Sequence, residues 1–503
     1  MRALLSVYDK TGLVELGQGL VDLGWELVAS GGTAAALMAD GIPHSTVESV
    51  TDAPEMLGGR VKTLHPRIHG AILADRSRPE HLEDLVARDI TPIDLVVCNL
   101  YPFRSEPSIE LIDVGGPTML RAAAKNWAHV GVVVDPADYP AVLQELEETD
   151  KLSDGLRLRL AREAFSHTAA YDAAIVTWFD EQVGEGSLPP TIHLALEKVQ
   201  TLRYGENPHQ GAARYREVNP PTWWDGVQSH GGIELSYLNL FDADAAWRLA
   251  FQLADLGTVA GVVVKHANPC GAAVAPDAAT AYERAFECDP MSAFGGIVAL
   301  TAPVDGALAE AIVSNPRSDV LIAPGYDSAA LEIFAARRKS MRVLTAPKPT
   351  TPVRHLRQIS GAWLVQDPYR LVSGRGDWRV VTKARPSEEN WADLEFAWRV
   401  CAAVTSNAIV LAKGGMAVGI GGGQQNRVSP GALAAERASG RAVGGAAASD
   451  AFFPFRDGLD AVASAGIAAV IQPGGSTNDE KVIAAADEHG LVMVFTGERQ
   501  FRH

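Results

Sequence analysis

Short apolar runs alternate with amphipathic stretches along the first part of the chain. Residues 3–7 and 26–29 have the composition of strands, and the segment between them, 14–23, is typical of an amphipathic helix. Residues 95–98 and 130–134 are apolar runs of the kind found in strands buried on both faces. Strands that alternate with helices predict a parallel sheet covered by helices.

The same alternation resumes after a polar stretch with glycines and prolines at 184–190, which indicates a domain boundary. A proline-rich stretch at 346–352 indicates a seam within the second part. No internal repeat is evident. We expect two α/β domains, 1–190 and 191–503, the second divided into two lobes near 346–352. The strands predicted in the second domain are 259–264, 297–300, 417–420, 468–471 and 491–495.

Composition narrows the possible partners. The net charge of -17 disfavours binding to the phosphate backbone of nucleic acids, so anionic small molecules would require local basic clusters. No run approaches the roughly 20 apolar residues of a membrane span, and charge interrupts the N-terminus too early for a signal peptide. The four cysteines are scattered without a CxxC pair, which favours a reducing compartment. We expect a cytoplasmic protein.

Two segments of the first domain carry groups suited to an anion. The glycine turn at 30–33 lies between a predicted strand and a predicted helix, where backbone amides and the helix N-terminus attract phosphate. Most glycine turns of this kind connect a strand to a helix without binding a ligand. In 58–66, Arg60 and Lys62 follow two glycines and project to the same side if the segment is extended. The alternative for this segment is a solvated basic loop.

Two further segments add groups that can move protons. Tyr101 follows the buried run at 95–98, at the end of a strand where open α/β sheets bind ligands. Asp113 precedes two glycines and a helical stretch that contains Lys125. A carboxylate, a phenol and ammonium groups together can transfer protons and stabilise an oxyanion.

The second domain has its own candidate chemistry. The apolar strand at 259–264 ends in Lys265 and His266, and imidazole transfers protons near neutral pH while ammonium stabilises negative charge. Most adjacent Lys-His pairs lie on the protein surface and have no chemical function. This pair, however, directly follows a buried run. The glycine-rich segment 419–427 does not complete a dinucleotide fingerprint, because Gln424 stands where the third glycine belongs.

In order along the chain, these segments resemble one family, the bifunctional purine-biosynthesis proteins that combine aminoimidazole carboxamide ribotide transformylase with inosine monophosphate cyclohydrolase. The resemblance covers essentially the whole chain. It implies a methylglyoxal-synthase-like parallel-sheet domain carrying the cyclohydrolase, then a transformylase region of two cytidine-deaminase-like α/β lobes. It also implies a homodimer with transformylase sites between subunits, 10-formyltetrahydrofolate as formyl donor, and no catalytic metal. It rests on residues 30–33, 58–66, 98–103, 113–126, 202–210, 265–271, 421–427 and 449–457.

For the transformylase, the resemblance implies that His266 takes the proton of the attacking amine. Lys265 would stabilise the tetrahedral oxyanion or help the folate nitrogen to depart, and Asn407 would align substrate and formyl group. The positions that match ribotide or folate contacts in the family are Arg203, Tyr204, Asn239, Gly295, Asp319, Arg427, Phe452, Asp457 and Arg499.

For the cyclohydrolase, the resemblance implies that Asp113 and Lys125 shuttle protons, while Lys62 polarises the formyl oxygen. Tyr101 would orient the substrate or donate a proton. Tyr8 stands where many relatives carry serine, which puts one phosphate contact in doubt. The substrate-binding positions implied are Ser30, Gly31, Gly32, Thr33, Arg60 and Thr63.

Two alternatives differ in class. A zinc nucleobase deaminase needs a P-C-x-x-C pair, but Ala273 stands three residues after Cys270, so the second thiolate is missing. A non-catalytic ribotide-binding module would need neither the Lys265–His266 pair nor Lys62 with its partners. We therefore expect an enzyme that formylates the ribotide and then closes the second ring to give inosine monophosphate.

Overall fold

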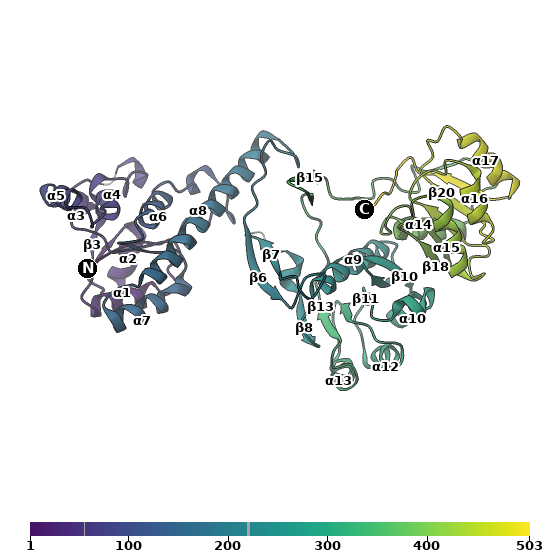
Figure 1. The fold of residues 1–503 in the computed structure, drawn as a ribbon, viewed down its shortest axis with the longest axis horizontal. Helices are drawn as coiled ribbons and strands as arrows, with labels where there is room; N and C mark the ends of the chain where they lie inside the picture. Colours follow the sequence, from purple (N-terminus) through teal and green to yellow (C-terminus); the bar gives the residue numbers. More distant parts are fainter. Residues whose placement is uncertain (55, 219–221) are drawn as a thin grey trace. The chain divides into compact units, whose positions relative to one another are not determined.

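The structure of the chain, a computed structural model, describes residues 1–54, 56–218 and 222–503. It divides into two compact units, one formed by Met1–Leu196 and the other by Glu197–Arg216 with residues 222 to 503 (Figure 1). Each unit has a separate hydrophobic core. Within the described ranges, no helix is long and apolar enough to cross a membrane.

The first unit is built on a five-stranded sheet in the order β3-β2-β1-β4-β5. All neighbouring strands are parallel, as the sequence predicts. Because β1 has β2 on one side and β4 on the other, the strand order reverses at β1, which is where open α/β sheets usually bind ligands. The strands are β1 (Arg2–Ser6), β2 (Glu26–Ala29), β3 (Ser45–Thr46), β4 (Leu95–Cys98) and β5 (Gly131–Val133).

Amphipathic helices pack on this sheet. The long α8 contacts both α6 and β5, and α6 also contacts β4. The helices are α1 (Leu13–Asp22), α2 (Gly31–Ala39), α3 (Val47–Thr51), α4 (Pro66–Leu73), α5 (Pro79–Ala87), α6 (Gly115–Lys125), α7 (Tyr139–Thr149) and α8 (Asp154–Val183).

The second unit contains a twelve-stranded mixed sheet in the order β16-β21-β20-β19-β17-β18-β10-β9-β11-β12-β13-β8. Two further pairs, β6–β7 and β14–β15, form separate two-stranded sheets. The strands are β6 (Leu196–Leu202), β7 (Ala212–Glu217), β8 (Gln228–Gly231), β9 (Val259–Lys265), β10 (Asn268–Ala275), β11 (Ile297–Leu300), β12 (Val320–Ala323), β13 (Arg342–Thr345), β14 (His355–Ile359), β15 (Ala362–Gln366), β16 (Arg379–Val380), β17 (Ile409–Lys413), β18 (Met416–Gly421), β19 (Ala446–Ser449), β20 (Ala469–Gln472) and β21 (Val492–Phe495).

This sheet is made of two lobes with the same topology. Each lobe has a helix, then an antiparallel hairpin, then three strands that pair in parallel with one another. The hairpins β9–β10 and β17–β18 meet through antiparallel β10 and β18, which joins the lobes into one sheet. Figure 1 shows the first lobe in teal and green and the second in green and yellow. The helices are α9 (Tyr237–Ala254), α10 (Ala278–Cys288), α11 (Pro290–Ala293), α12 (Gly306–Ser314), α13 (Ser328–Arg337), α14 (Glu388–Cys401), α15 (Val428–Ala438), α16 (Arg456–Ala463) and α17 (Asp479–Glu488).

The structure corrects one sequence interpretation and confirms others. The sequence shows no evident internal repeat, yet the fold of the second unit is a duplication. All predicted strands are confirmed, each within one residue of an observed strand at either end, and so is the helix predicted at 14–23. The apolar runs locate strands because they must be buried, whereas duplication depends on the order in which strands pair.

Glycines allow each hairpin to lie close to the helix that follows it. A Cβ on Gly271 in β10 would lie 1.8 Å from the carbonyl oxygen of Ala285 in α10. A Cβ on Gly419 in β18 would lie 2.1 Å from the carbonyl oxygen of Ala434 in α15. Both distances are far below contact distance, so the close approach of helix and hairpin requires glycine at these positions.

Gly271→Ala should therefore destabilise the second unit by about 1–3 kcal/mol, since α10 must move away from the sheet to admit a methyl group. Thermal unfolding of the full chain measures this. Gly211→Ala is the control, because nothing lies within 4 Å of the Cβ that it would add. Equal unfolding temperatures for the two variants would contradict the packing argument.

Candidate functional site

In the first unit, the loops after three neighbouring strands meet at the carboxyl edge of the sheet. The hydroxyl groups of Ser6, at the end of β1, and Ser30, after β2, lie 2.8 Å apart. Asn99, after β4, accepts hydrogen bonds through its Oδ1 from the N–H groups of Tyr8 (2.6 Å) and Asp9 (2.9 Å). This edge lies where the strand order reverses, the usual ligand site of an open α/β sheet.

The N-terminus of α2 faces this edge. Ser30 is its N-cap residue but makes no capping hydrogen bond with its side chain. A Cβ on Gly31, whose φ is +37°, would lie 3.3 Å from the ammonium nitrogen of Lys62. Lys62 also pairs with Glu48 at 3.0 Å. A helix N-terminus with an ammonium group beside it favours an anion.

Thr33 lies in the same turn, but its hydroxyl is engaged by the fold. It accepts a hydrogen bond from the N–H of Val7 (3.0 Å) and donates one to the carbonyl of the same residue (3.1 Å). The side chain is buried, with 2% of its surface exposed. Thr33 therefore ties α2 to the end of β1.

The segment that carries Arg60 and Lys62 is a turn. Gly58 and Gly59 have φ values of +62° and +90°, which fold the chain back before α4. The extended conformation in which Arg60 and Lys62 would project to the same side is therefore not adopted. Arg60 is largely exposed and pairs with Glu110 at 2.5 Å.

Asp113 lies immediately before α6 in a half-buried position. Its Oδ1 accepts the N–H of Gly116 (2.9 Å), and its own N–H donates to the hydroxyl of Tyr171 (2.8 Å). Tyr171 in turn donates to the carbonyl of Leu111 (2.6 Å). Burial raises the pKa of Asp113, and backbone N–H groups at the start of α6 lower it in part.

Asp113 and Lys62 belong to the electrostatic surroundings of Tyr101. Burial raises the pKa of Tyr101, the charge of Asp113 raises it further, and the ammonium of Lys62 opposes the shift. Thr63 is also near, because its hydroxyl oxygen lies 2.7 Å from where a Cβ of Gly115 would be. The edge of the Tyr101 ring packs against Tyr8 with ring centroids 5.8 Å apart.

The structure does not bring Lys125 into this cluster. Gly115 begins α6 and Lys125 is its last residue. At 1.5 Å per residue, the two ends of the helix are about 15 Å apart. Lys125 is exposed at the far end of α6, away from the carboxylate of Asp113.

In the second unit, Lys265 ends β9 and pairs with Asn268, the first residue of β10. The turn between them contains only His266 and Ala267, with φ values of +54° and +55°. His266 is exposed at the tip of the turn. Asp242, from α9, accepts the N–H of Ala267 (2.7 Å) and the N–H of His266 (3.2 Å).

Two contacts link this turn to its surroundings. The ammonium of Lys265 donates to the carbonyl of Phe294 (3.0 Å), and Asn268 Oδ1 accepts the N–H of Thr405 (2.8 Å). Gly295, next to Phe294, donates its N–H to the carbonyl of Arg317 (2.7 Å). The turn therefore lies between the loop at 294–295 of its own lobe and the loop at 405–407 of the other.

Asn407 is held in that second loop by a buried arginine. Arg427 donates to Asn407 Oδ1 (2.6 Å) and forms an ion pair with Asp450, which has no exposed surface. The hydroxyl of Ser406 donates to the same carboxylate. Because both partners of the ion pair are buried, the orientation of Asn407 is tightly fixed.

A cavity of about 250 Å³ collects basic side chains in the first lobe. Arg317 and Asp319 pair at 2.9 Å, and the guanidinium of Arg203 lies 5.3 Å from the centre of the Tyr204 ring. Burial lowers the pKa of Arg342. Three guanidinium groups line this cavity. The lining residues are Arg203, Tyr204, Ile233, Arg317, Asp319, Ser340 and Arg342.

The sequence did not identify Arg317 and Arg342 as candidate site residues. Arg342 begins the buried strand β13 and is only 6% exposed. A charged residue at the start of an apolar strand is the signal that could have identified it, because arginine is rarely buried without a partner. It donates to the carbonyls of Ile233 and Glu234.

The other predicted positions are placed as follows. Asn239 is buried in the first turn of α9, where its Oδ1 accepts the N–H of the N-cap residue Ser236 (3.0 Å). Asp457 accepts the N–H of Gly458 at the start of α16. Phe452 is 39% exposed. The guanidinium of Arg499 lies 4.4 Å from the centre of the Phe501 ring.

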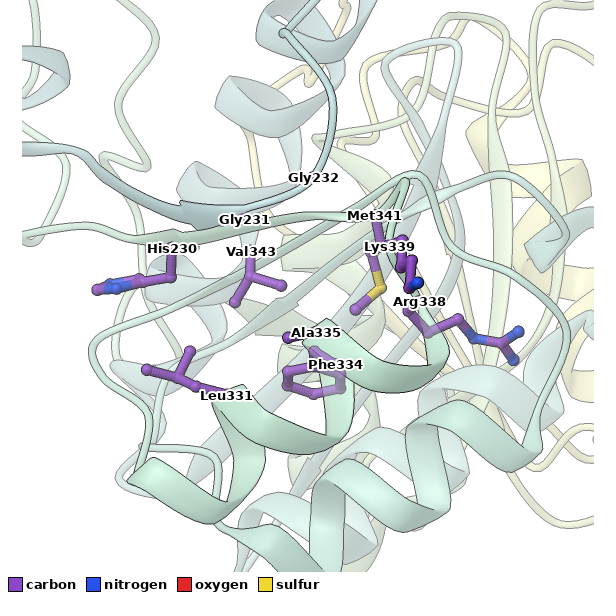
Figure 2. A pocket seen from close by; sticks show the side chains of 10 residues that line it. All are labelled: His230, Gly231, Gly232, Leu331, Phe334, Ala335, Arg338, Lys339, Met341 and Val343. Carbon is purple, nitrogen blue, oxygen red and sulfur yellow. The ribbon is translucent and has the colours of Figure 1, made fainter.

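A second cavity, of about 200 Å³, lies between α13 and the β8–β13 edge of the sheet. Figure 2 shows that Leu331 and Phe334 from α13 face Val343, with Met341 beside them. Arg338 at its rim points away and donates to the carbonyls of Val313 and Asn315. Its lining includes none of the predicted site residues.

Comparison with known proteins gives matches over the whole chain. The family described as AICARFT/IMPCHase bienzyme matches residues 123–437, and the family described as MGS-like domain matches residues 12–127. The chain is 48% identical to "Bifunctional purine biosynthesis protein PurH" of Neisseria meningitidis serogroup A, covering 100% of this chain and 99% of that protein. The protein of the same name from Neisseria gonorrhoeae is 47% identical with the same coverage. A solved structure titled "Crystal structure of ForH" is 40% identical, with a TM-score of 0.34, and covers 36% of this chain and 98% of that one.

Thr33→Val should destabilise the first unit by about 1–3 kcal/mol, because the isosteric change leaves the N–H and carbonyl of Val7 without their buried partner. Thermal unfolding measures the effect. Thr177→Val is the control, since Thr177 donates a comparable bond to Ala173 on the exposed surface of α8. Unchanged stability of Thr33→Val would mean that the hydroxyl is free for another role.

Proposed function

Since the chain belongs to the AICARFT/IMPCHase bienzyme family, we propose that its two reactions take place in separate units. The chain is a bifunctional enzyme of purine biosynthesis, both 5-aminoimidazole-4-carboxamide ribotide formyltransferase and inosine monophosphate cyclohydrolase. We assign ring closure to residues 1–190, which contain the MGS-like domain, and formyl transfer to residues 191–503. Family membership excludes the zinc deaminase and the non-catalytic module considered above.

For formyl transfer, the carrying observation is the exposed imidazole of His266 beside Lys265 on a turn fixed between two loops. The exocyclic amine of the ribotide is a weak nucleophile, because its lone pair is delocalised into the ring. His266 takes the proton of this amine as the nitrogen attacks the formyl carbon. Lys265 stabilises the tetrahedral oxyanion or assists departure of the folate nitrogen, and Asn407 aligns the two reactants.

The basic cavity supports binding of the ribotide near this turn. Arg203, Arg317 and Arg342 present a fixed fork geometry that matches phosphate oxygens. Gly295 connects the cavity wall to the loop that Lys265 contacts. The ribotide and the formyl donor, which we take to be 10-formyltetrahydrofolate, also contact Tyr204, Asn239, Asp319, Arg427, Phe452, Asp457 and Arg499 in this proposal.

For ring closure, the ribotide phosphate binds at the N-terminus of α2 beside Ser30, Gly31 and Gly32. The carboxamide nitrogen then attacks the formyl carbon, and water leaves. Asp113, with its raised pKa, accepts the proton of this nitrogen. Tyr101 donates to the departing oxygen. Lys62 polarises the formyl oxygen.

The proposal includes four further positions. In this proposal Arg60, Thr33 and Thr63 also contact the phosphate, although the hydroxyl of Thr33 is engaged with Val7. Lys125 is separated from Asp113 by the length of α6, so a role in proton transfer would require another route than direct contact. No catalytic metal is part of the proposed mechanism.

A second copy of the chain is the proposed partner. The hairpin β14–β15 exposes large apolar side chains, among them Trp363 (58%) and Leu364 (56%), and the flanking Val353 and Val372 are more exposed still. A two-stranded hairpin is marginally stable alone, so contact with another subunit would stabilise it.

We also place the enzyme in the cytoplasm. The four cysteines are buried free thiols, and burial raises their pKa, which keeps them protonated.

The two-site proposal is tested by separating the activities. Purified protein is incubated with the ribotide and 10-formyltetrahydrofolate, or with formylated ribotide alone. His266→Ala should slow formyl transfer by roughly a hundredfold to ten-thousandfold and leave ring closure intact. Lys62→Ala should do the reverse.

His230→Ala serves as the control for loss of a histidine, since His230 lines the other cavity. Equal loss of both activities in either folded site variant would contradict separate sites. Absence of tetrahydrofolate among the products of the wild-type reaction would contradict the proposed formyl donor.

The raised pKa of Asp113 predicts an acid limb in the ring-closure reaction. Because the pKa lies above the ordinary carboxyl value, the proton-accepting carboxylate is lost at a higher pH than usual, and kcat/KM should fall as the pH falls through this raised pKa. In Asp113→Asn the plateau should drop and the limb disappear. A pH profile that stays flat down to the ordinary carboxyl pKa would argue against Asp113 as the base.

A further inference from the structure

The duplicated lobes of the second unit share a sequence pattern as well as a topology. In the first lobe, serine, asparagine, aspartate and tryptophan stand at Ser236, Asn239, Asp242 and Trp247. The same four residue types recur at the same spacing along α14 and at its N-cap. They are Ser387, Asn390, Asp393 and Trp398.

The matching residues have matching structural roles. Both serine and asparagine pairs form capping boxes at the N-termini of α9 and α14. Trp247 and Trp398 are both fully buried. The two aspartates are buried to a similar degree, 8% exposed for Asp242 and 5% for Asp393. The lobes can therefore serve as internal controls for each other.

Each aspartate reaches the turn of the hairpin in its own lobe. Asp393 accepts the N–H of Gly415 at 2.9 Å, in the turn between β17 and β18. Asp242 accepts the equivalent N–H, that of Ala267, at 2.7 Å. It also accepts the N–H of His266 at 3.2 Å through its other oxygen.

The two turns have the same shape but different residues. Lys413 pairs with Met416 as Lys265 pairs with Asn268, so each turn has two residues. All four turn residues have positive φ: +58° and +72° at the glycines of the second lobe, +54° and +55° at His266 and Ala267. Such turns favour glycine or asparagine. A histidine and an alanine here are strained, and a strained backbone persists only where its surroundings hold it.

We propose that Asp242 is a positioning residue for formyl transfer: its two carboxylate oxygens hold the backbone of His266 and Ala267 in the left-handed conformation that directs the imidazole to the substrate. This inference rests on the proposed role of His266 as the base. Asp242 approaches the turn from α9 through backbone N–H groups, so it acts through His266 and not on the reactants. Its counterpart Asp393 supports a glycine turn without an imidazole and has no such task.

The test compares Asp242→Ala with the matched variant Asp393→Ala in the full chain. Both should lower the unfolding temperature, because each removes the acceptor of a turn N–H. Only Asp242→Ala should lower the kcat of formyl transfer, by about tenfold to a hundredfold, because a displacement of about 1 Å in a catalytic group has effects of this size. The KM for the ribotide and the ring-closure rate of the same chain should be largely unchanged.

A second pair of variants keeps the test decisive if Asp242→Ala does not fold. Asp242→Asn retains the shape and one acceptor oxygen, so its kcat should fall less. Adding Ala267→Gly to Asp242→Asn relieves part of the strain in the turn. The double variant should therefore recover part of the kcat that Asp242→Asn loses. Wild-type kcat in Asp242→Asn, or no recovery with Ala267→Gly, would overturn the proposal.

His266→Ala separates failure of this inference from failure of the proposed function. If His266→Ala retains formyl transfer, the assignment of the base is wrong. If His266→Ala is inactive while Asp242→Ala keeps wild-type kcat, only the positioning role is wrong. If Asp393→Ala lowers kcat as much as Asp242→Ala, the aspartates are merely structural and the positioning role is again overturned.

Discussion

The conformation of the two-residue turn between β9 and β10 is the constraint on which the chemistry of the second unit depends. In this two-residue connection both residues have positive φ, the conformation of the type I′ turns that are common in hairpins. For residues other than glycine this conformation is unfavourable by roughly 1–2 kcal/mol each. The strand pairing and the carboxylate of Asp242 hold His266 and Ala267 there, and the imidazole stands exposed while the adjoining strands are buried.

The acidic chain binds anions by local arrangement of charge. The net charge of -17 repels polyanions, but fields between exposed charges are screened within about 8 Å at physiological salt. Within that range, Lys62 beside the N-terminus of α2 and the three arginines of the first lobe dominate. The N-terminus of α2 follows β2, at the carboxyl edge where open sheets bind ligands, whereas Arg317 precedes β12 and Arg342 begins β13.

Particular residues show how far sequence reasoning reached. The Lys265–His266 pair was identified because an apolar run ended in it, and the structure places it at the end of β9. Asp113 and Lys62 both act on the pKa of Tyr101, whereas Lys125 lies at the other end of α6. The segment of Arg60 and Lys62 is not extended, because two glycines with positive φ turn the chain before them. Asp242 carried no signal, since an aspartate one turn into a helix is common.

The sequence by itself determined where the strands lie and which segments carry chemistry, because burial imposes apolar runs and each run is read from neighbouring residues. Tertiary structure alone decided which of these segments meet. The duplication of the lobes, the convergence of Arg203, Arg317 and Arg342, and the contact between Asp242 and the His266 turn all join residues far apart in the chain. The physical reason is that periodicity reports the environment of each residue, whereas the identity of its neighbours depends on the order and direction in which strands pair and on the helices that pack across them.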